Sequence, residues 1–305
     1  MKISIIIPVY KTEEVGYIYR TISGIERTIG LPLNEYTVTL VGTLPGDMFK
    51  TRLSTSIKWS FQPTDKRLGP AKNQGAEYAM GHFNPDVLVF MDAHMNFFDK
   101  QSANWGQVVY DFIMNHPNAA ASPAISLYDM PVQRGYGVIS DITEDDIEMD
   151  LKWKWVGEPP DNDAPFEVPG LCGCFMAMKP KTFKDSIVGY TPPLAIDDRE
   201  FSIRIWLLGK DMYSIPQLSI GHRFASGYSD FSTERAIDWG MGMLLYTFLN
   251  LGSDMTMRLY EKGIHSTPDK AESLRRATTP YWKQVRQEIL RKSVRTPEQY
   301  FRRFS

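Results

Sequence analysis

A carboxylate and an imidazole follow directly on a strongly apolar run in this sequence. Residues Val87 to Met91 are all apolar, which is typical of a strand covered on both faces in a parallel sheet. Asp92 and His94 come next, two positions apart, so their side chains point the same way if the extended conformation continues. Ligands bind at the carboxyl ends of strands in open α/β sheets, so this pair predicts a divalent-cation site that could hold a substrate's phosphates. The alternative is a turn that ends the strand and binds nothing.

Strand and helix patterns alternate around this run. Strand patterns cover residues 3–9, 36–41, 86–92, 119–127, 171–178 and 212–215, and helical spacing covers 13–29, a segment from 68, 102–115 and 196–208. The helix that opens at Leu68 carries the small residues Ala71, Gly75, Ala76 and Ala79, which allow close packing. This rhythm predicts an α/β fold, with a mostly parallel sheet flanked by helices.

Length and composition set the broad class. With 305 residues, 43% of them hydrophobic, the chain can bury a large core. We expect a main domain over residues 1–230 and a basic, mainly helical C-terminal region over 231–305. No apolar run has the length of a membrane span, and the N-terminus lacks the pattern of a signal peptide. These features predict a cytoplasmic protein.

The loops and the cysteines add two expectations. Residues 141–169 include an acidic stretch, two tryptophans and a segment rich in Pro, Asp and Asn, which predicts a long excursion over the sheet that could act as a lid. Cys172 and Cys174 are the two cysteines of the chain. Their spacing predicts two small buried side chains on one face of a strand rather than a disulfide or a zinc site.

Charge is distributed unevenly along the chain. Between Arg258 and Arg303 there are twelve Lys and Arg against five Asp and Glu, a net charge of +7, whereas the whole chain carries −2. The rest of the chain must therefore carry −9. The interpretation that we favour is a solvated helical face. A contact with nucleic acid or another polyanion is the alternative.

Several segments together resemble the GT-A glycosyltransferases, in particular the family-2 group and the Asp-x-His subgroup typified by the polypeptide N-acetylgalactosaminyltransferases. The segments are Ile3-Ser-Ile-Ile-Ile-Pro-Val-Tyr10, Arg67-Leu-Gly-Pro-Ala-Lys-Asn-Gln-Gly-Ala76, Asp92-Ala-His94, Ser122-Pro-Ala-Ile125, Leu151-Lys-Trp-Lys-Trp155, Pro169-Gly-Leu-Cys-Gly-Cys-Phe175, Asp197-Asp-Arg-Glu-Phe-Ser-Ile-Arg-Ile-Trp206 and Ile220-Gly-His-Arg-Phe224. The resemblance covers residues 2–225 and assigns a GT-A catalytic domain to the first 230 residues.

The resemblance implies a set of metal and catalytic residues. Asp92, His94 and His222 would bind a divalent cation, Mn2+ or else Mg2+. Asp197 would hydrogen-bond the sugar's hydroxyls, and Asp198 or Glu200 would orient the acceptor. The alternative for these three acids is a capping role, because acidic residues are favoured in the first turn of a helix.

The resemblance also implies contacts to a nucleotide-sugar donor. Gly170 and Gly173 would let the backbone approach the donor sugar, Arg67 would meet the nucleotide or its phosphates, and Trp153 would stack on a ring. The alternatives are a surface ion pair for Arg67 and a core position for Trp153. The full set of expected donor contacts is Pro8, Tyr10, Arg67, Asp92, Ala93, Trp153, Gly170 and Gly173.

The implied function is that of a retaining, metal-dependent glycosyltransferase with a UDP-sugar donor and a glycan or protein hydroxyl as acceptor. The alternatives are an inverting family-2 enzyme, a transferase acting on a hydroxylated nucleic-acid base, and a non-catalytic sugar- or nucleic-acid-binding module on this fold. Two positions depart from the family. Val41-Gly42-Thr43 stands where the base-contacting Asp is usual, and Ala225 replaces the Arg after the last motif.

Overall fold

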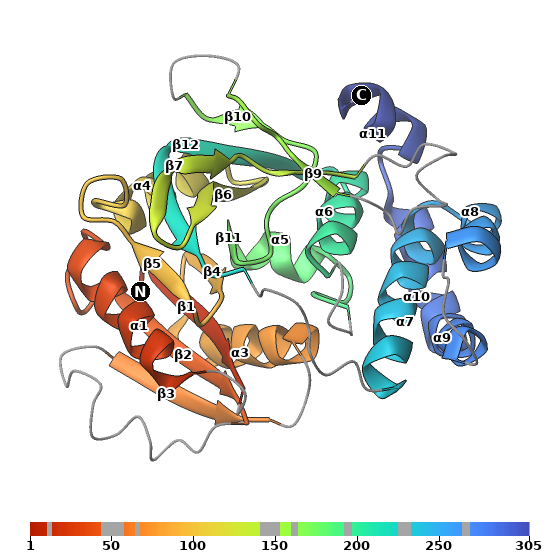
Figure 1. The fold of residues 1–305 in the computed structure, drawn as a ribbon, viewed down its shortest axis with the longest axis horizontal. Coiled ribbons are helices and arrows are strands. Elements are labelled where there is room, and N and C mark those ends of the chain that lie inside the picture. The colour runs from red at the N-terminus through yellow and green to blue at the C-terminus, as the bar shows by residue number, and fades with distance from the viewer. Residues whose placement is uncertain are drawn as a thin grey trace.

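The computed structural model describes residues 1–10, 14–43, 58–64, 68–140, 153–159, 164–191, 197–224, 233–263 and 269–304. Within these ranges the centre is a ten-stranded mixed sheet (Figure 1). Its strands are β1 (Ile3–Val9), β2 (Tyr36–Gly42), β3 (Lys58–Pro63), β4 (Val87–Met91), β5 (Met95–Phe97), β6 (Ala119–Leu127), β7 (Met130–Gly135), β10 (Phe166–Glu167), β11 (Phe175–Met178) and β12 (Asp211–His222). The strands β8 (Val138–Ser140) and β9 (Trp153–Trp155) pair in a separate sheet.

The strand order is β10-β12-β6-β11-β4-β1-β2-β3, with β5 beside β12 and β7 beside β6. The four strands β3, β2, β1 and β4 are parallel, as are β6 and β12. Between these groups β11 is antiparallel to both β4 and β6. The α/β class with a largely parallel sheet, predicted from the alternating patterns, is confirmed.

Helices cover both faces of the sheet. The side chains of alternate strand residues point to opposite faces, where they pack in two separate hydrophobic clusters. Ile3, Ile5 and Ile7 of β1 pack with α1 (Val15–Thr28) and α4 (Trp105–Asn115). Ile6 and the even-numbered residues of β4 pack with the helices of the opposite face. Those helices are α3 (Leu68–Phe83), α5 (Pro180–Asp185) and α6 (Asp197–Leu207).

The C-terminal helices extend the second cluster instead of forming a core of their own. Buried Leu244, Trp282 and Tyr300 belong to the same cluster as Phe90 of β4, and the Tyr300 hydroxyl donates to the Pro169 carbonyl at 2.5 Å. In Figure 1 these helices gather on the far side of α6. They are α7 (Thr233–Asn250), α8 (Ser253–Arg258), the π-helix η2 (Leu259–Gly263), α9 (Asp269–Ala277), α10 (Pro280–Lys292) and α11 (Pro297–Phe304). The division at residue 230 stays a prediction.

Two expectations about strands need correction, and a third, the lid, falls mostly outside the described residues. The strand expected over 212–215 runs from Asp211 to His222, because pairing with β6 resumes at Ser219 after an irregularity. The strand expected from Leu171 begins at Phe175, so Cys172 and Cys174 precede it; both are buried free thiols with their sulfurs 3.3 Å apart. Most of the expected lid, residues 141–152 and 160–163, lies outside the described residues.

None of the helices in the described ranges combines the length and the apolar character that a membrane span requires.

The close packing of α3 can be tested at two of its glycines. A Cβ at Gly75 would lie 2.5 Å from Ile6 Cγ2 and 2.7 Å from Val41 Cγ2, whereas a Cβ at exposed Gly81 would meet nothing within 4 Å. We expect Gly75→Ala to destabilise the fold by about 1–3 kcal/mol through overpacking. Gly81→Ala, the matched control, should stabilise it by roughly 0.5–1 kcal/mol through helix propensity. Urea unfolding followed by circular dichroism measures both, and equal effects would contradict the packing.

Candidate metal and donor site

Three strand ends bring one carboxylate and two imidazoles together. Asp92 follows β4, His94 precedes β5, and His222 is the last residue of β12. The antiparallel pairing of β5 with β12 sets His222 opposite Met95, and the Arg223 backbone N–H donates to the His94 carbonyl at 3.2 Å. The two imidazoles therefore lie side by side, with ring centroids 4.9 Å apart.

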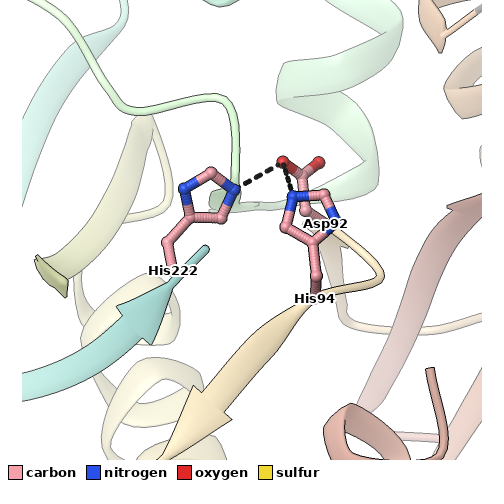
Figure 2. A group of neighbouring side chains, drawn as sticks. All are labelled: Asp92, His94 and His222. Carbon is pink, nitrogen blue, oxygen red and sulfur yellow. Dashed lines mark hydrogen bonds and ion pairs between the residues drawn. The ribbon is translucent and has the colours of Figure 1, made fainter. Parts of the chain in front are cut away.

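The geometry of this group suits a divalent cation. Asp92 Oδ2 lies 3.1 Å from His222 Nε2 and 3.9 Å from His94 Nε2, and Figure 2 shows both rings turned toward that oxygen. One ligand atom from each residue falls within 4.8 Å of the others. One carboxylate and two imidazoles are ligands common to Mn2+ and neighbouring divalent metals, and such a set leaves coordination positions for a substrate.

Charge and hydrogen bonding keep Asp92 ionised. Burial acts to raise the pKa of Asp92, but the hydrogen bond from His222 and the nearby charges of His94 and Lys72 lower it to about 2. His222 Nδ1 is buried without a hydrogen-bond partner among the described residues. In the described part of the chain, no hydrogen bond to Nδ1 therefore fixes the tautomer of His222. An anionic Asp92 is the form that a cation requires.

Helix α1 and the turn before β11 hold the Asp92 turn in place. The Thr21 hydroxyl lies 2.9 Å from the Ala93 carbonyl and accepts from the Met95 N–H at 2.9 Å. The Asp92 N–H donates to the Cys174 carbonyl at 3.0 Å. Ala93, expected to contact the donor, is 2% exposed. The turn is thus fixed from two sides, which preorganises the carboxylate.

The first turn of α6 brings two of the expected acids to the same region. Buried Asp197 pairs with Lys72 of α3 at 3.1 Å, and Asp198 Oδ2 accepts from the Gly173 N–H at 2.9 Å. Burial raises the pKa of Asp197 to about 6, with Lys72 opposing and the charges of Asp198 and Asp92 adding to the rise. Asp92, Asp197 and Asp198 thus share one electrostatic environment.

Glu200 is engaged elsewhere. Its two carboxylate oxygens each accept from the Arg204 guanidinium at 2.8 Å, and they also accept from Thr191 at 3.0 Å and Asn250 at 3.1 Å. Arg204 is fully buried and donates further to the backbone carbonyls of Ser186 and Gly189. These contacts favour a structural role for Glu200, which ties α6 to α7 and to the loop that follows α5.

The expected glycines lie against the protein's own atoms. A Cβ at Gly170 would lie 2.8 Å from the Val138 carbonyl oxygen, and a Cβ at Gly173 would lie 2.9 Å from Asp198 Cβ. Gly170 therefore permits a backbone contact in which its carbonyl accepts from the Val138 N–H at 2.9 Å. Gly173 permits the approach of Asp198 beside the metal-site turn.

The remaining expected donor contacts fall in three classes. Pro8 is buried in β1 opposite Val41, and Tyr10 follows directly on that strand, half-buried. Trp153 begins β9, where its backbone pairs with Ser140; its side chain is not described. Arg67 lies outside the described residues.

An aromatic row leads from His222 of the candidate metal site to β9. The ring of Phe224 packs edge-on against His222, with centroids 4.4 Å apart, and Trp155 packs edge-on against Phe224 at 5.8 Å. Phe224 is 37% exposed. The sequence reasoning gave Phe224 no role, although its place two residues after a candidate ligand was a usable signal. These rings form one wall beside the candidate metal site.

Comparisons with known proteins place this arrangement in a wider group. No family model matches the chain. Polypeptide N-acetylgalactosaminyltransferase 10 of Homo sapiens is 28% identical over 169 residues, which span 52% of this chain and 26% of that protein. The crystal structure of GalNAc-T7 with UDP, GalNAc and Mn2+ superposes with a TM-score of 0.73 at 16% identity, covering 99% of this chain and 56% of that one. The chain has the GT-A fold.

A second GT-A structure agrees. TarS 1–349 of S. aureus in complex with UDP-GlcNAc superposes with a TM-score of 0.55 at 12% identity, covering all of this chain and 84% of that one. The resemblance to GT-A glycosyltransferases inferred from the sequence motifs is confirmed. The chain spans only about a quarter of the length of the curated relative named above, so the activity of that relative does not by itself define the activity of this chain.

Within this GT-A fold, the end of β2, where the sequence lacks the usual Asp, leaves no room for a side chain at position 42. A Cβ at Gly42 would lie 1.6 Å from the Val9 carbonyl oxygen, and the Thr43 N–H donates to that same carbonyl at 3.1 Å. No side chain fits at position 42 without movement of the backbone. A carboxylate side chain is therefore excluded at this position. Ala225, the other departure, lies outside the described residues.

Lys72, the partner of Asp197, was not among the expected site residues, although it lies in the segment 67–76 that resembles the GT-A motif. Lys72 lies on the face of α3 that carries Ala71, Gly75, Ala76 and Ala79 and is 1% exposed. A lysine among the small buried residues of a packed helix face was the available signal, because lysine is almost never fully buried unless it is paired.

Proposed function

We propose that this protein is a metal-dependent glycosyltransferase that moves a sugar from a nucleotide-sugar donor, a UDP-sugar, to a hydroxyl acceptor. The observation that carries the proposal is the convergence of Asp92, His94 and His222 at one edge of a GT-A sheet. A structural neighbour crystallised with UDP, GalNAc and Mn2+ and a relative named as a GalNAc-transferase support the donor class and the choice of Mn2+ over Mg2+.

Sugar transfer requires charge stabilisation on a departing diphosphate, which a bound divalent cation supplies as a Lewis acid. In the proposal Asp92, His94 and His222 hold that cation. Asp197 accepts hydrogen bonds from the sugar's hydroxyls, and Asp198 orients the acceptor as well as holding the Gly173 backbone. Retention of the anomeric configuration is proposed from the resemblance to the Asp-x-His subgroup, and inversion is the alternative.

The proposed donor contacts are the residues expected from the sequence, and mutation of each residue tests its contact with the donor. Gly170 and Gly173 remain among the proposed contacts; the Gly170 carbonyl accepts from the Val138 N–H, and the Gly173 N–H donates to the Asp198 carboxylate. For Glu200 we propose the structural role that its ion pair with Arg204 supports, in place of a contact with the acceptor.

The proposed acceptor is a glycan or protein hydroxyl. Several of the basic residues that suggested nucleic acid are engaged with acids: Arg276 with Glu234, Arg295 with Asp211 and Arg303 with Glu167. These pairs reduce the positive field that a polyanion would meet. Binding of DNA or RNA that weakens linearly with the logarithm of salt concentration would favour the nucleic-acid alternative.

The test is a thermal-shift screen of UDP-, GDP-, ADP- and CMP-sugars, each with MnCl2, with MgCl2 and with EDTA. We expect a UDP-sugar with Mn2+ to give the largest rise in Tm, and Mn2+-dependent release of UDP from the same donor. Binding without hydrolysis or transfer would favour the non-catalytic module. The anomeric configuration of the product, read by NMR, separates retention from inversion. The cytoplasmic location stays a prediction, for cell fractionation to check.

A further inference from the structure

Lys72 is a fully buried cation that the proposed chemistry has not used. It lies in α3 at 1% exposure, and its ammonium is 3.1 Å from Asp197 Oδ2 and 3.3 Å from the Gly173 carbonyl oxygen. The ring of Tyr190 packs beneath it, with the nitrogen 4.6 Å from the ring centroid. The carboxylate, the carbonyl oxygen and the aromatic ring each stabilise the positive charge of the Lys72 ammonium.

The carboxylates around Lys72 outnumber it. Burial acts to lower the pKa of Lys72, but the charges of Asp197, Asp92 and Asp198 together raise it above its usual value. One ammonium cannot neutralise three carboxylates, so the group keeps an excess of negative charge when the histidines are neutral. A divalent cation at Asp92 would offset that excess, which links Lys72 to the metal site through charge as well as geometry.

Lys72 also joins three elements that surround the proposed donor site. It reaches from α3 to the first residue of α6, Asp197, and to Gly173 in the turn before β11. The same turn accepts from the Asp92 N–H through the Cys174 carbonyl, and its Gly173 N–H donates to Asp198. Movement of the ammonium would therefore release the Asp197 carboxylate and one side of the Gly173 peptide together.

We propose that Lys72 is a positioning residue for sugar transfer, one that fixes the Asp197 carboxylate and the Gly173 carbonyl in the geometry that the donor's sugar requires. This inference rests on the proposed function. Lys72 acts through Asp197 and the Gly173 backbone, so its contribution depends on Asp197 being present. A purely structural ion pair would instead contribute to stability alone.

The kinetic test is a double-mutant cycle with Lys72→Met, Asp197→Asn and the double variant. The assay is Mn2+-dependent hydrolysis of UDP-GalNAc by the full chain, with kcat and KM measured separately. We expect Lys72→Met to lower kcat by ~10²-fold, the loss typical of a misplaced catalytic geometry. In the Asp197→Asn background the same change should lower kcat less than about threefold, because the group through which Lys72 acts is already lost.

The conservative and control variants separate position from charge and from stability. Lys72→Arg keeps the cation and should recover part of the lost kcat. Lys210→Met removes another largely buried lysine, paired with Asp185 at 2.8 Å, and should lower Tm with kcat unchanged. Affinity for UDP with Mn2+, measured by calorimetry, should stay within about threefold of wild type in Lys72→Met, since the three metal-site side chains remain.

A second readout does not depend on turnover. Asp197 is faced by Lys72 from α3, Asp198 on its own helix, Asp92 at the end of β4, and Tyr190. Burial already raises the pKa of Asp197, so without Lys72 its folded-state pKa should rise further above the unfolded value. An acid whose folded-state pKa is raised destabilises the folded protein increasingly as pH rises from its unfolded pKa through its folded pKa. The Tm of Lys72→Met should therefore fall between pH 5 and pH 8 relative to wild type. The double variant should not show this fall.

Two results overturn the proposal: a wild-type kcat in folded Lys72→Met, or an equal loss of kcat in both backgrounds of the cycle. If wild type hydrolyses no sugar nucleotide, the proposed function fails, and the positioning role fails with it. The pH-dependent melting then still reports whether the ion pair itself exists. An inactive wild type therefore argues against the glycosyltransferase function, whereas an active wild type with an unaffected Lys72→Met argues against the positioning role alone.

Discussion

Asp92→Asn and His222→Ala are each expected to abolish the stabilisation that Mn2+ and UDP together give to the folded protein. Each change removes one of three ligand atoms that lie within 4.8 Å of one another. A ligand present at 100 times its Kd stabilises by about 2.7 kcal/mol, and a 100-fold loss of affinity reduces this to about 0.4 kcal/mol. The Tm shift of several degrees expected in wild type should therefore nearly disappear.

The apo proteins should remain folded, which makes the metal effect separable. Asn at position 92 can still bond His222 through its amide and removes one of the crowded carboxylates. His82→Ala is the matched control, since His82 is exposed and bonds only its own helix at the Tyr78 carbonyl among the contacts described. Equal UDP affinity with Mn2+ and with EDTA in wild type would sink the metal assignment, as would full Mn2+ dependence in both variants.

The parts of the fold that were predictable are those whose pattern is local. The apolar run from Val87 to Met91 identified β4 because a strand buried on both faces needs nothing from the rest of the chain to be recognised. The three-residue strand β5 was not predictable, since Met95–Phe97 is too short for a period to show. Yet β5 is the strand that sets His222 beside His94.

The site was predictable only where residue type and family resemblance agreed. Asp92 and His94 were predicted from the end of one apolar strand and the types of the two side chains that follow it. His222 came from the resemblance, and it contacts Asp92, which lies 130 residues earlier in the sequence. Glu200 and Asp197 were both expected to contact substrate, Glu200 the acceptor and Asp197 the sugar, and both stand in the first turn of α6. Their separation depends on Arg204, whose partner cannot be chosen from spacing alone, since i, i+4 pairs are common on exposed helix faces as well.

The second large effect is a contrast between Glu200 and Asp197. Loss of the Glu200 charge should lower stability, whereas loss of the Asp197 charge should lower kcat. Glu200→Gln removes the charge that balances fully buried Arg204, and breaking such a pair typically costs about 3–5 kcal/mol. At roughly 2–4 °C per kcal/mol the Tm should fall by about 10 °C. The kcat per folded molecule, measured well below that Tm, should stay close to wild type.

Asp197→Asn should show the reverse. Burial raises the pKa of Asp197, so an uncharged amide of the same shape replaces a carboxylate whose charged form is already disfavoured. Asp92 and Asp198 still balance Lys72, and the Tm should change by no more than a few degrees. The kcat should fall by about 10²–10³-fold, as when a donor or acceptor aimed at the reacting sugar is removed. Differential scanning fluorimetry and donor hydrolysis on the same preparations measure both quantities. A stable Glu200→Gln that cannot turn over would return Glu200 to the reaction, and an active Asp197→Asn would reduce Asp197 to a helix cap.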